Sequence, residues 1–338
     1  MKVSPGKLWG LRRLADEGGF WKMVAIDQRT PLLAPIAKAR GLTEAPYDDM
    51  ARFKALLARH LAPRASALLV DPNYGYAAAV PHVPPTTGLI LSIEHHATDE
   101  TPGGRKSRMI PDWNAAKIRR IGADAAKVLV WHRHDAAPEV KAHQFAFVEA
   151  CANACREADL VHLLEILVYP LPGESAHIDA ATRAERVTRA VADFHDERFG
   201  VDIWKLEPPI PLANVPDPDG KEAGAAQAAY DRLAQNLTRP WVLLSAGAGP
   251  EDFARQLVYA YRAGAAGYLC GRAIWAHAFE AFPDWAEMEK RVVAGSIPYV
   301  ERINALTDRL ATPWDRHAGW GGQPELAIQG PEFAKAYA

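Results

Sequence analysis

The chain of 338 residues is 49% hydrophobic and 24% charged, and its formal net charge is −2 at pH 7. Because this is an ordinary globular composition with nearly balanced charge and no basic block, we expect neither nucleic acid nor an anionic membrane surface as a partner. No apolar run approaches the roughly 18 residues of a membrane span, no signal peptide is recognisable, and three cysteines are too few for a disulfide framework, so we expect a cytoplasmic protein.

Short apolar runs alternate with amphipathic helical stretches along most of the chain. Strands are expected at Met23–Arg29, Ala67–Pro72, Gly88–Glu94, Ala125–Trp131, Val161–Tyr169, Asp202–Pro208, Trp241–Gly247 and Gly267–Arg272. Helices are expected at Tyr47–Leu61, Trp113–Ile121, Val140–Ala158, Ala180–Arg198, Ala223–Leu237, Pro250–Ala263, Ile274–Phe282 and Asp284–Leu310. This alternation indicates a parallel sheet with crossover helices, and eight such units predict a (β/α)₈ TIM barrel. The alternative is an open doubly wound sheet, but no Gly-x-Gly-x-x-Gly follows the first strand, which disfavours a dinucleotide-binding version.

The domain organisation follows from this pattern. Residues 1–311 are predicted to form a single barrel domain, and residues 312–338 a tail rich in Gly, Pro and Trp without a clear period. We expect this irregular tail to pack across the barrel or to become ordered at a subunit contact, and the protein to be a homo-oligomer. The loops Thr98–Arg108 and Pro208–Pro218 are expected to be mobile covers.

Most predicted strands carry a chemically active group near the C-terminal end. Active sites of barrel enzymes are built at that end, from several strands at once. The groups are Asp27, Gln28, Arg29, Asp71, Glu94, His95, Glu165, Ser245 and Arg272.

Lys205 lies within the sixth predicted strand. Strand alternation places Ile203, Lys205 and Glu207 on one face, and Trp204 and Leu206 on the other. If the tryptophan and leucine pack under covering helices, Lys205 points into the barrel. A buried ammonium is costly, so such a lysine is usually paired or readily deprotonated, and a neutral lysine can form a Schiff base with a carbonyl. The alternative is a structural ion pair with a carboxylate such as Glu207.

Three further charged residues are candidates for the same site. Lys127 in the fourth strand is expected to lie near Lys205 and, as a neighbouring cation, to favour its neutral form. Glu165 can move a proton to and from a substrate hydroxyl, and Asp27 can hold an imine or a hydroxyl by hydrogen bonds. The alternative for each of the three is a salt bridge within this group.

The last two strands end in small residues that suit an anion. Backbone N–H groups can approach a phosphate closely there, the helix after Arg272 adds a favourable dipole, and Arg272 can bind the phosphate bidentately. The alternative is a pair of tight turns. The candidate residues are Ser245, Gly247, Gly271 and Arg272.

The histidine and cysteine pairs do not predict a metal site. His95 and His96 point to opposite faces of a strand, and Cys151 and Cys155 lack further ligands nearby in sequence. We therefore expect no metal, although a metal-dependent aldolase or hydrolase on this scaffold is an alternative.

Six motifs, in chain order, resemble those of the class I tagatose 1,6-bisphosphate aldolase family. They are Ala25–Arg29, Leu69–Gly75, Gly122–Lys127, Arg198–Glu207, Leu244–Gly247 and Leu269–Ala276. The resemblance implies a TIM barrel that reversibly cleaves a ketohexose 1,6-bisphosphate (of tagatose or fructose) to dihydroxyacetone phosphate and glyceraldehyde 3-phosphate without a cofactor. It implies that Lys205 forms the Schiff base, that Glu165 transfers the proton, and that Lys127 and Asp27 line the same pocket. It places the 1-phosphate at Ser245, Gly247, Gly271 and Arg272.

Two segments, Lys127–Arg133 and Pro240–Ser245, are more similar to the related sulfofructose 1-phosphate aldolase, which yields dihydroxyacetone phosphate and sulfolactaldehyde. The far-end anion of the substrate is therefore either phosphate or sulfonate. Gln28 and Arg29 are expected to contact the substrate, and Arg29, Arg105, Lys106 and Arg108 are the candidates for that distal anion. A sugar-phosphate sensor without catalytic activity is a further alternative.

Overall fold

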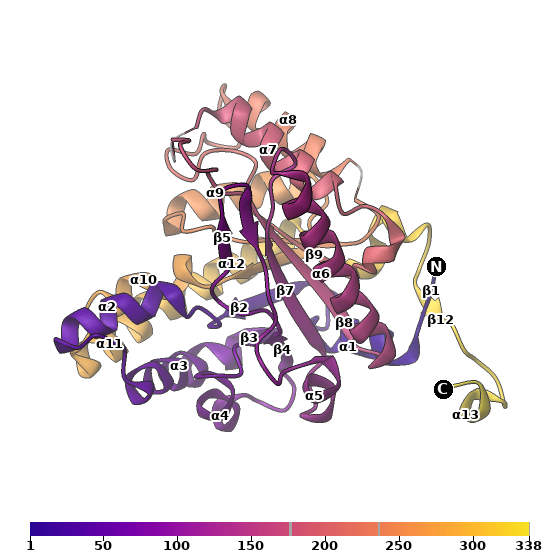
Figure 1. Ribbon diagram of the computed structural model, residues 1–338, viewed down its shortest axis with the longest axis horizontal. Coiled ribbons are helices and arrows are strands. Elements are labelled where there is room, and N and C mark those ends of the chain that lie inside the picture. The colour runs from indigo at the N-terminus through magenta and orange to yellow at the C-terminus, as the bar shows by residue number, and fades with distance from the viewer. Residues whose placement is uncertain (176–177, 236, 338) are drawn as a thin grey trace.

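A closed barrel of parallel strands forms the centre of the protein (Figure 1). The computed structural model describes residues 1–175, 178–235 and 237–337, so that Asn236 of one predicted helix and Ala338 of the predicted tail lie outside the described residues. Within the described part, eight strands close the barrel in chain order, and the last pairs with the first, which confirms the predicted TIM barrel. They are β2 (Trp21–Ala25), β3 (Ala67–Val70), β4 (Gly88–Ser92), β7 (Ala125–Trp131), β8 (Val161–Leu167), β9 (Ile203–Leu206), β10 (Trp241–Leu243) and β11 (Gly267–Cys270).

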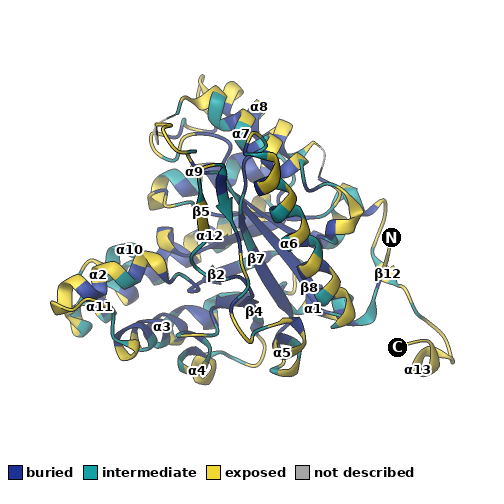
Figure 2. Cartoon of the chain, viewed as in Figure 1, coloured by how far each residue is buried: buried dark blue, intermediate teal, exposed yellow. Residues whose placement is uncertain are grey.

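Helices cover the outside of the barrel, with their exposed faces turned to solvent (Figure 2). They are α2 (Thr30–Arg40), α3 (Tyr47–Leu61), α4 (Tyr76–Ala79), α5 (Ala115–Arg120), α6 (Pro138–Glu157), α7 (Ala180–Ala192), α8 (Ala223–Ala234), α9 (Pro250–Arg262), α10 (Arg272–Phe279), α11 (Trp285–Arg291) and α12 (Ile297–Leu310). A π-helical turn, Val292–Ser296, joins the last two into the single long stretch that the sequence predicts. No helix among the described residues is long and apolar enough to cross a membrane.

Two of the predicted segments differ in the structure, and helix α2 was not predicted. The helix expected to reach Arg198 ends at Ala192. The Asp196 side chain accepts a hydrogen bond from the backbone N–H of Arg198 and begins a separate 3₁₀ turn. The segment Thr98–Arg108 contains an antiparallel hairpin of β5 (Asp99–Thr101) and β6 (Gly104–Lys106) in place of an irregular loop.

Strand alternation separates two apolar layers. The inner layer fills the barrel and includes Met23, Leu163 and Ile203, whereas their chain neighbours Val24 and Leu164 pack under the helices. The strands appear as a continuous buried centre in Figure 2. A residue two positions after an inner residue also points inward, so this layer fixes the direction of the charged groups that follow it.

Segments from both ends of the chain close the N-terminal end of the barrel. The Trp314 ring stacks on Trp21 with 6.0 Å between centroids, and Trp320 packs edge-on against Trp314 at 6.2 Å. Beside them lie α1 (Pro5–Arg13) and the short parallel pair β1 (Lys2–Val3) and β12 (Glu325–Leu326), and the chain ends in α13 (Phe333–Ala336) (Figure 1). The tail thus packs across the barrel, which is one of the two arrangements expected. The division of the chain at residue 311 stays a prediction.

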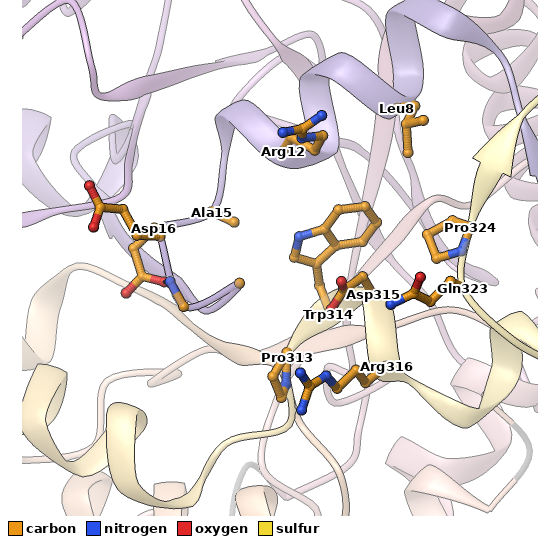
Figure 3. Close-up of a pocket in the computed structure, with 13 residues that line it drawn as sticks. Leu8, Arg12, Ala15, Asp16, Pro313, Trp314, Asp315, Arg316, Gln323 and Pro324 are labelled. Atoms are coloured by element: carbon orange, nitrogen blue, oxygen red, sulfur yellow. The ribbon is translucent and has the colours of Figure 1, made fainter.

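A cavity of about 530 Å³ lies at this closed end, between α1 and the tail. Figure 3 shows Trp314 at its centre, with Arg12 on the α1 side and Arg316 on the tail side. It is separate from the cavity at the opposite, C-terminal end of the strands, which is lined by the predicted residues Glu165, Lys205 and Arg272 but not by Asp27 or Lys127.

Candidate active site

The side chains of Lys127, Glu165 and Lys205 meet inside the barrel near the C-terminal ends of their strands. Each follows an inner-layer residue by two positions, so the alternation that buries Ala125, Leu163 and Ile203 also turns these charges inward. Their inward direction agrees with the strand alternation read from the sequence, and their catalytic roles stay a prediction. All three are buried, with at most 7% of each residue exposed.

Among the described residues, the carboxylate that Lys205 contacts is that of Glu165. The Lys205 Nζ atom lies 2.9 Å from Glu165 Oε2 across the neighbouring strands β9 and β8. Glu207, the alternative partner considered from the sequence, instead accepts hydrogen bonds from the Val168 backbone N–H and from Arg183. Burial raises the pKa of Glu207, and Arg183 opposes that shift. The lysine is thus paired with a group suited to proton transfer.

Lys127 lies at the centre of three carboxylates. Its Nζ atom is 2.8 Å from Asp27 Oδ2, 2.7 Å from Glu94 Oε1 and 3.2 Å from the same Glu165 oxygen that Lys205 contacts. Burial acts to lower the pKa of Lys127, but these three carboxylates outweigh it and hold the pKa above its usual value. Lys127 and Lys205 therefore lie near each other, as predicted, and both contact the same oxygen of Glu165.

The predicted effect of Lys127 on Lys205 needs revision. The sequence predicts that Lys127, as a neighbouring cation, favours the neutral form of Lys205, with a salt bridge between Lys127 and a carboxylate as the alternative. Because three carboxylates compensate the charge of Lys127, repulsion between the two lysines is not the main electrostatic feature of the site.

Asp27 is held as an anion. Its Oδ2 atom accepts a hydrogen bond from the Ser92 hydroxyl at 2.9 Å, besides its contact with Lys127. Burial acts to raise the pKa of Asp27, but Lys127 and Lys205 outweigh it and hold the pKa well below its usual value.

Arg29 is 4% exposed and is bound to Glu94, both at the carboxylate and at the backbone carbonyl, each at 3.2 Å. It balances the charge of Glu94 and is not among the residues that line the cavity. Gln28 does line that cavity, and its buried Oε1 atom has no hydrogen-bond partner among the described residues. Gln28 can therefore accept a hydrogen bond from a bound ligand.

The cavity at the C-terminal end has a volume of about 240 Å³ and contains the predicted phosphate residues Ser245, Gly271 and Arg272. The guanidinium of Arg272 is exposed and contacts no carboxylate among the described residues. Any Cβ at Gly271 would lie 2.3 Å from the carbonyl oxygen of Ala25, so this approach of two strands requires glycine. Gly247, at φ +100°, lies against the Arg272 guanidinium. Ser245, Gly247 and Gly271 thus lie close to the Arg272 guanidinium, which has no carboxylate partner among the described residues.

Glu94, Arg183 and Lys54 also belong to the surroundings of this site, although the sequence did not assign them to it. Glu94 was recognised only as a polar group at a strand end, and it joins Lys127 to Arg29. Arg183 comes from α7 and lines the cavity. Lys54 comes from α3 and binds the backbone carbonyls of Ile26 and Gln28. No local pattern marks the last two, because helical spacing alone does not show which residues reach the end of a strand.

The histidines near this end of the barrel are not among the residues that line the cavity. His95 and His96 stack on each other at 4.4 Å, and His132 pairs with Asp193 at 2.8 Å. Among the described residues, no group of three or more His, Cys, Asp and Glu side chains is arranged to hold a metal ion. The position between the three carboxylates is occupied by the ammonium of Lys127.

Solved structures of aldolases share this fold. Fructose-bisphosphate aldolase from Plasmodium falciparum superposes with a TM-score of 0.64 at 15% identity, over 92% of this chain and 98% of that one. An archaeal fructose 1,6-bisphosphate aldolase superposes with a TM-score of 0.57 at 12% identity, over 90% of this chain and 99% of that one. At these identities the likeness shows the fold alone, which is that of a TIM barrel.

The sequence comparisons identify the family. The chain belongs to the DeoC/LacD family of aldolases, whose model matches residues 22–277, and it is an aldolase, a carbon–carbon lyase. Tagatose 1,6-diphosphate aldolase 2 of Streptococcus mutans is 30% identical over 334 residues, which cover 95% of this chain and 100% of that protein. Tagatose 1,6-diphosphate aldolase of Listeria monocytogenes is 30% identical over 327 residues, with 93% and 95% covered.

Proposed function

We propose that this aldolase acts through a Schiff base on Lys205 and cleaves a ketohexose 1,6-bisphosphate to dihydroxyacetone phosphate and glyceraldehyde 3-phosphate. The observation that carries the proposal is the buried Lys205 ammonium 2.9 Å from Glu165, in a cavity that also holds the unpaired Arg272. The names of the bacterial relatives support the choice of a ketose bisphosphate. Ser245, Gly247, Gly271 and Arg272 would hold the 1-phosphate, and Gln28 a substrate hydroxyl.

Glu165 can serve every proton transfer that the reaction needs. It first accepts the proton of Lys205, so that the neutral amine attacks C2 of the ketose. A proton of the attacking amine passes to the C2 oxygen and gives the carbinolamine. Glu165 then returns its own proton to that hydroxyl, which leaves as water and gives the iminium. Glu165 is then again a carboxylate and removes the proton of the C4 hydroxyl as the C3–C4 bond breaks and the aldehyde forms. The electron pair of that bond passes to the iminium and yields an enamine, which is protonated at C3 and hydrolysed.

The charges around Glu165 support this cycle. The Lys127 ammonium lies 3.2 Å from the reacting oxygen and therefore faces the negative charge that this oxygen carries whenever the proton has left. The cluster contains three cations (Arg29, Lys127 and Lys205) and three anions (Asp27, Glu94 and Glu165). A proton that moves from Lys205 to Glu165 leaves the total charge of this buried cluster unchanged, which avoids the cost of a net buried charge.

A test combines covalent trapping with an active-site variant. Borohydride reduction in the presence of dihydroxyacetone phosphate should add one three-carbon unit, which peptide mass spectrometry locates at residue 205. Lys205→Met should abolish the adduct and lower kcat for cleavage by at least about 10³-fold, because the nucleophile is lost. Lys221→Met, at an exposed lysine, is the matched control and should behave like the unaltered enzyme. Turnover that survives Lys205→Met, or that requires an added divalent metal ion, would refute the proposal.

A further inference from the structure

The order of functional groups around the barrel matches the order of atoms along a ketose 1-phosphate. Arg272 follows β11, Lys205 lies on β9, Glu165 on β8 and Trp131 at the end of β7, and all four line the same cavity. With a 1-phosphate at Arg272, C2 meets Lys205 and the C4 hydroxyl meets Glu165. The far end of the sugar then extends toward Trp131.

We infer that Arg105 binds a terminal oxyanion, phosphate or sulfonate, at that far end of the sugar. This inference rests on the proposed function and adds to it the residue that selects substrates by their distal charge. Arg105 lies on β6 of the hairpin, and its guanidinium carbon lies 4.8 Å from the centre of the Trp131 ring and 4.7 Å from that of Tyr169. The Arg105 guanidinium thus packs against two aromatic rings, and one of them, Trp131, is part of the cavity lining.

The hairpin is fixed to the rim of the barrel at several points. The backbone N–H of Arg105 donates a hydrogen bond to the Tyr169 hydroxyl at 2.8 Å, and the backbone N–H of Ala137 donates one to the Gly103 carbonyl at 3.1 Å. At the end of β6, the backbone N–H of Ser107 donates one to the buried Gln144 side chain at 3.0 Å. A Cβ at Gly104 would lie 2.3 Å from the Tyr169 hydroxyl, so this close docking requires glycine. Arg105 is thus presented by a fixed support rather than by a free loop.

The charge of Arg105 remains available to a ligand. Its one carboxylate partner in the described part of the chain is Glu100, at 3.0 Å on the same hairpin, and the Glu100 side chain is 67% exposed. Such an exposed pair is weak in water. A doubly charged phosphate or a sulfonate arriving along the cavity can replace Glu100 and gain charge-assisted hydrogen bonds from the guanidinium.

The other nearby cations fit this role less well. Arg183 lines the cavity, but it is bound to Glu207 and to the backbone carbonyls of Pro208 and Ile210. Arg29 is buried against Glu94. Lys106 follows Arg105 directly and therefore points to the opposite face of the hairpin, so it provides a control of equal charge on the same strand.

The experiment compares substrates with and without the distal anion. Steady-state cleavage is measured with fructose 1,6-bisphosphate, with 6-deoxy-6-sulfofructose 1-phosphate and with fructose 1-phosphate, for the unaltered enzyme, Arg105→Gln, Arg105→Lys and Lys106→Gln. Arg105→Gln should lower kcat/KM about 10- to 100-fold for whichever anion-ended sugar the enzyme prefers, mainly through KM, because one charge-assisted interaction is lost. Cleavage of fructose 1-phosphate should stay within about twofold. Arg105→Lys should recover part of the loss, and Lys106→Gln should lose nothing.

The outcomes separate this inference from the function on which it rests. A preference for the phosphate or for the sulfonate, lost in Arg105→Gln, supports the inference and identifies the anion. An equal loss on all three sugars, no loss on any, or the same loss in Lys106→Gln would overturn it while leaving the aldolase chemistry intact. If the unaltered enzyme cleaves none of these sugars and borohydride traps no adduct, the proposed function itself fails.

Discussion

Single residues in this protein show how burial acts on a titratable group that catalysis does not use. His162 lies on β8, three residues before Glu165, and is fully buried. Its Nδ1 atom lies 3.1 Å from the Phe199 carbonyl oxygen, and Nε2 has no partner among the described residues. Burial lowers the pKa of His162 to about 4, from 6.5 for a free histidine. This histidine is thus neutral in the folded protein at a pH where the unfolded chain protonates it.

The sign of the pH effect follows from proton uptake. Between pH 6.5 and about 4 the unfolded state binds the proton and the folded state does not, so the free energy of unfolding falls as the pH falls through this window. The full contribution is about 3 kcal/mol, from roughly 1.4 kcal/mol per unit of pKa. In His162→Asn the amide can donate the same hydrogen bond but does not titrate. Urea unfolding at pH 7 and pH 4.5 should therefore show a drop smaller by about 2 kcal/mol than in the unaltered protein.

The control for this prediction is His82→Asn, at an exposed histidine. It should keep the full pH dependence. Equal slopes for His162→Asn and the unaltered protein would contradict the argument and place the acid sensitivity in other groups, such as Asp27.

At the scale of elements, α3 holds the end of β2 in place. The Lys54 side chain is fully buried, donates hydrogen bonds to the carbonyls of Ile26 at 2.7 Å and Gln28 at 2.9 Å, and forms an ion pair with Asp71. Asp71 in turn accepts hydrogen bonds from the backbone after β3, at Asn73 and Tyr74. Lys54 therefore joins the turn that carries Asp27 and Gln28 to the adjacent strand.

Two variants separate the structural and the positioning contributions of Lys54. Lys54→Met alone leaves Asp71 buried without its partner and should cost about 3–5 kcal/mol of unfolding free energy. The double variant Lys54→Met with Asp71→Asn removes both charges and should regain most of that stability. Its kcat/KM should nevertheless stay about tenfold low, because the carbonyls of Ile26 and Gln28 are no longer held. Urea unfolding and steady-state cleavage measure the two effects, and full recovery of both would show that Lys54 only balances a charge.

Some of the strands and site residues could be predicted from the sequence, and others could not. The barrel strands and the inward direction of Lys127, Glu165 and Lys205 follow from a period of two, which local sequence carries. The helix α2 was missed because Pro35 lies within it and interrupts the helical pattern. The pairing of Glu165 with Lys205, and of Arg29 with Glu94, depends on which strands become neighbours. Local sequence does not contain that information, so the partners came from the structure.

On the scale of the whole molecule, the tail supplies part of the barrel core. Trp314 and Trp320 are 5% and 3% exposed and belong to the same inner layer as Trp21 and Met23. A chain that ends at residue 311 would expose this layer at the closed end, opposite the cavity that we propose to bind substrate. The predicted boundary at that residue can therefore be tested as a question of stability.

We expect a chain that ends at Ala311 to lose at least about 3 kcal/mol of unfolding free energy, comparable to removing one large aromatic side chain from a core. The KM of the fraction that remains folded should be unchanged. A chain that ends at Gly330 keeps both tryptophans and β12 and is the matched control. If the chain ending at Ala311 unfolds at the same urea concentration as the control, the barrel is independent of the tail.

The balance of positive and negative side chains inside the barrel also affects the rate at which a charged substrate binds. Because the six buried charges sum to zero, they exert little long-range force on an approaching sugar phosphate. Attraction at a distance then comes from exposed arginines such as Arg272, whose field dissolved salt attenuates over about 8–10 Å. Ionic strength would accordingly govern how often the enzyme captures its substrate, and the bond-breaking step, enclosed among its own counter-charges, would proceed at the same rate in dilute and in concentrated salt.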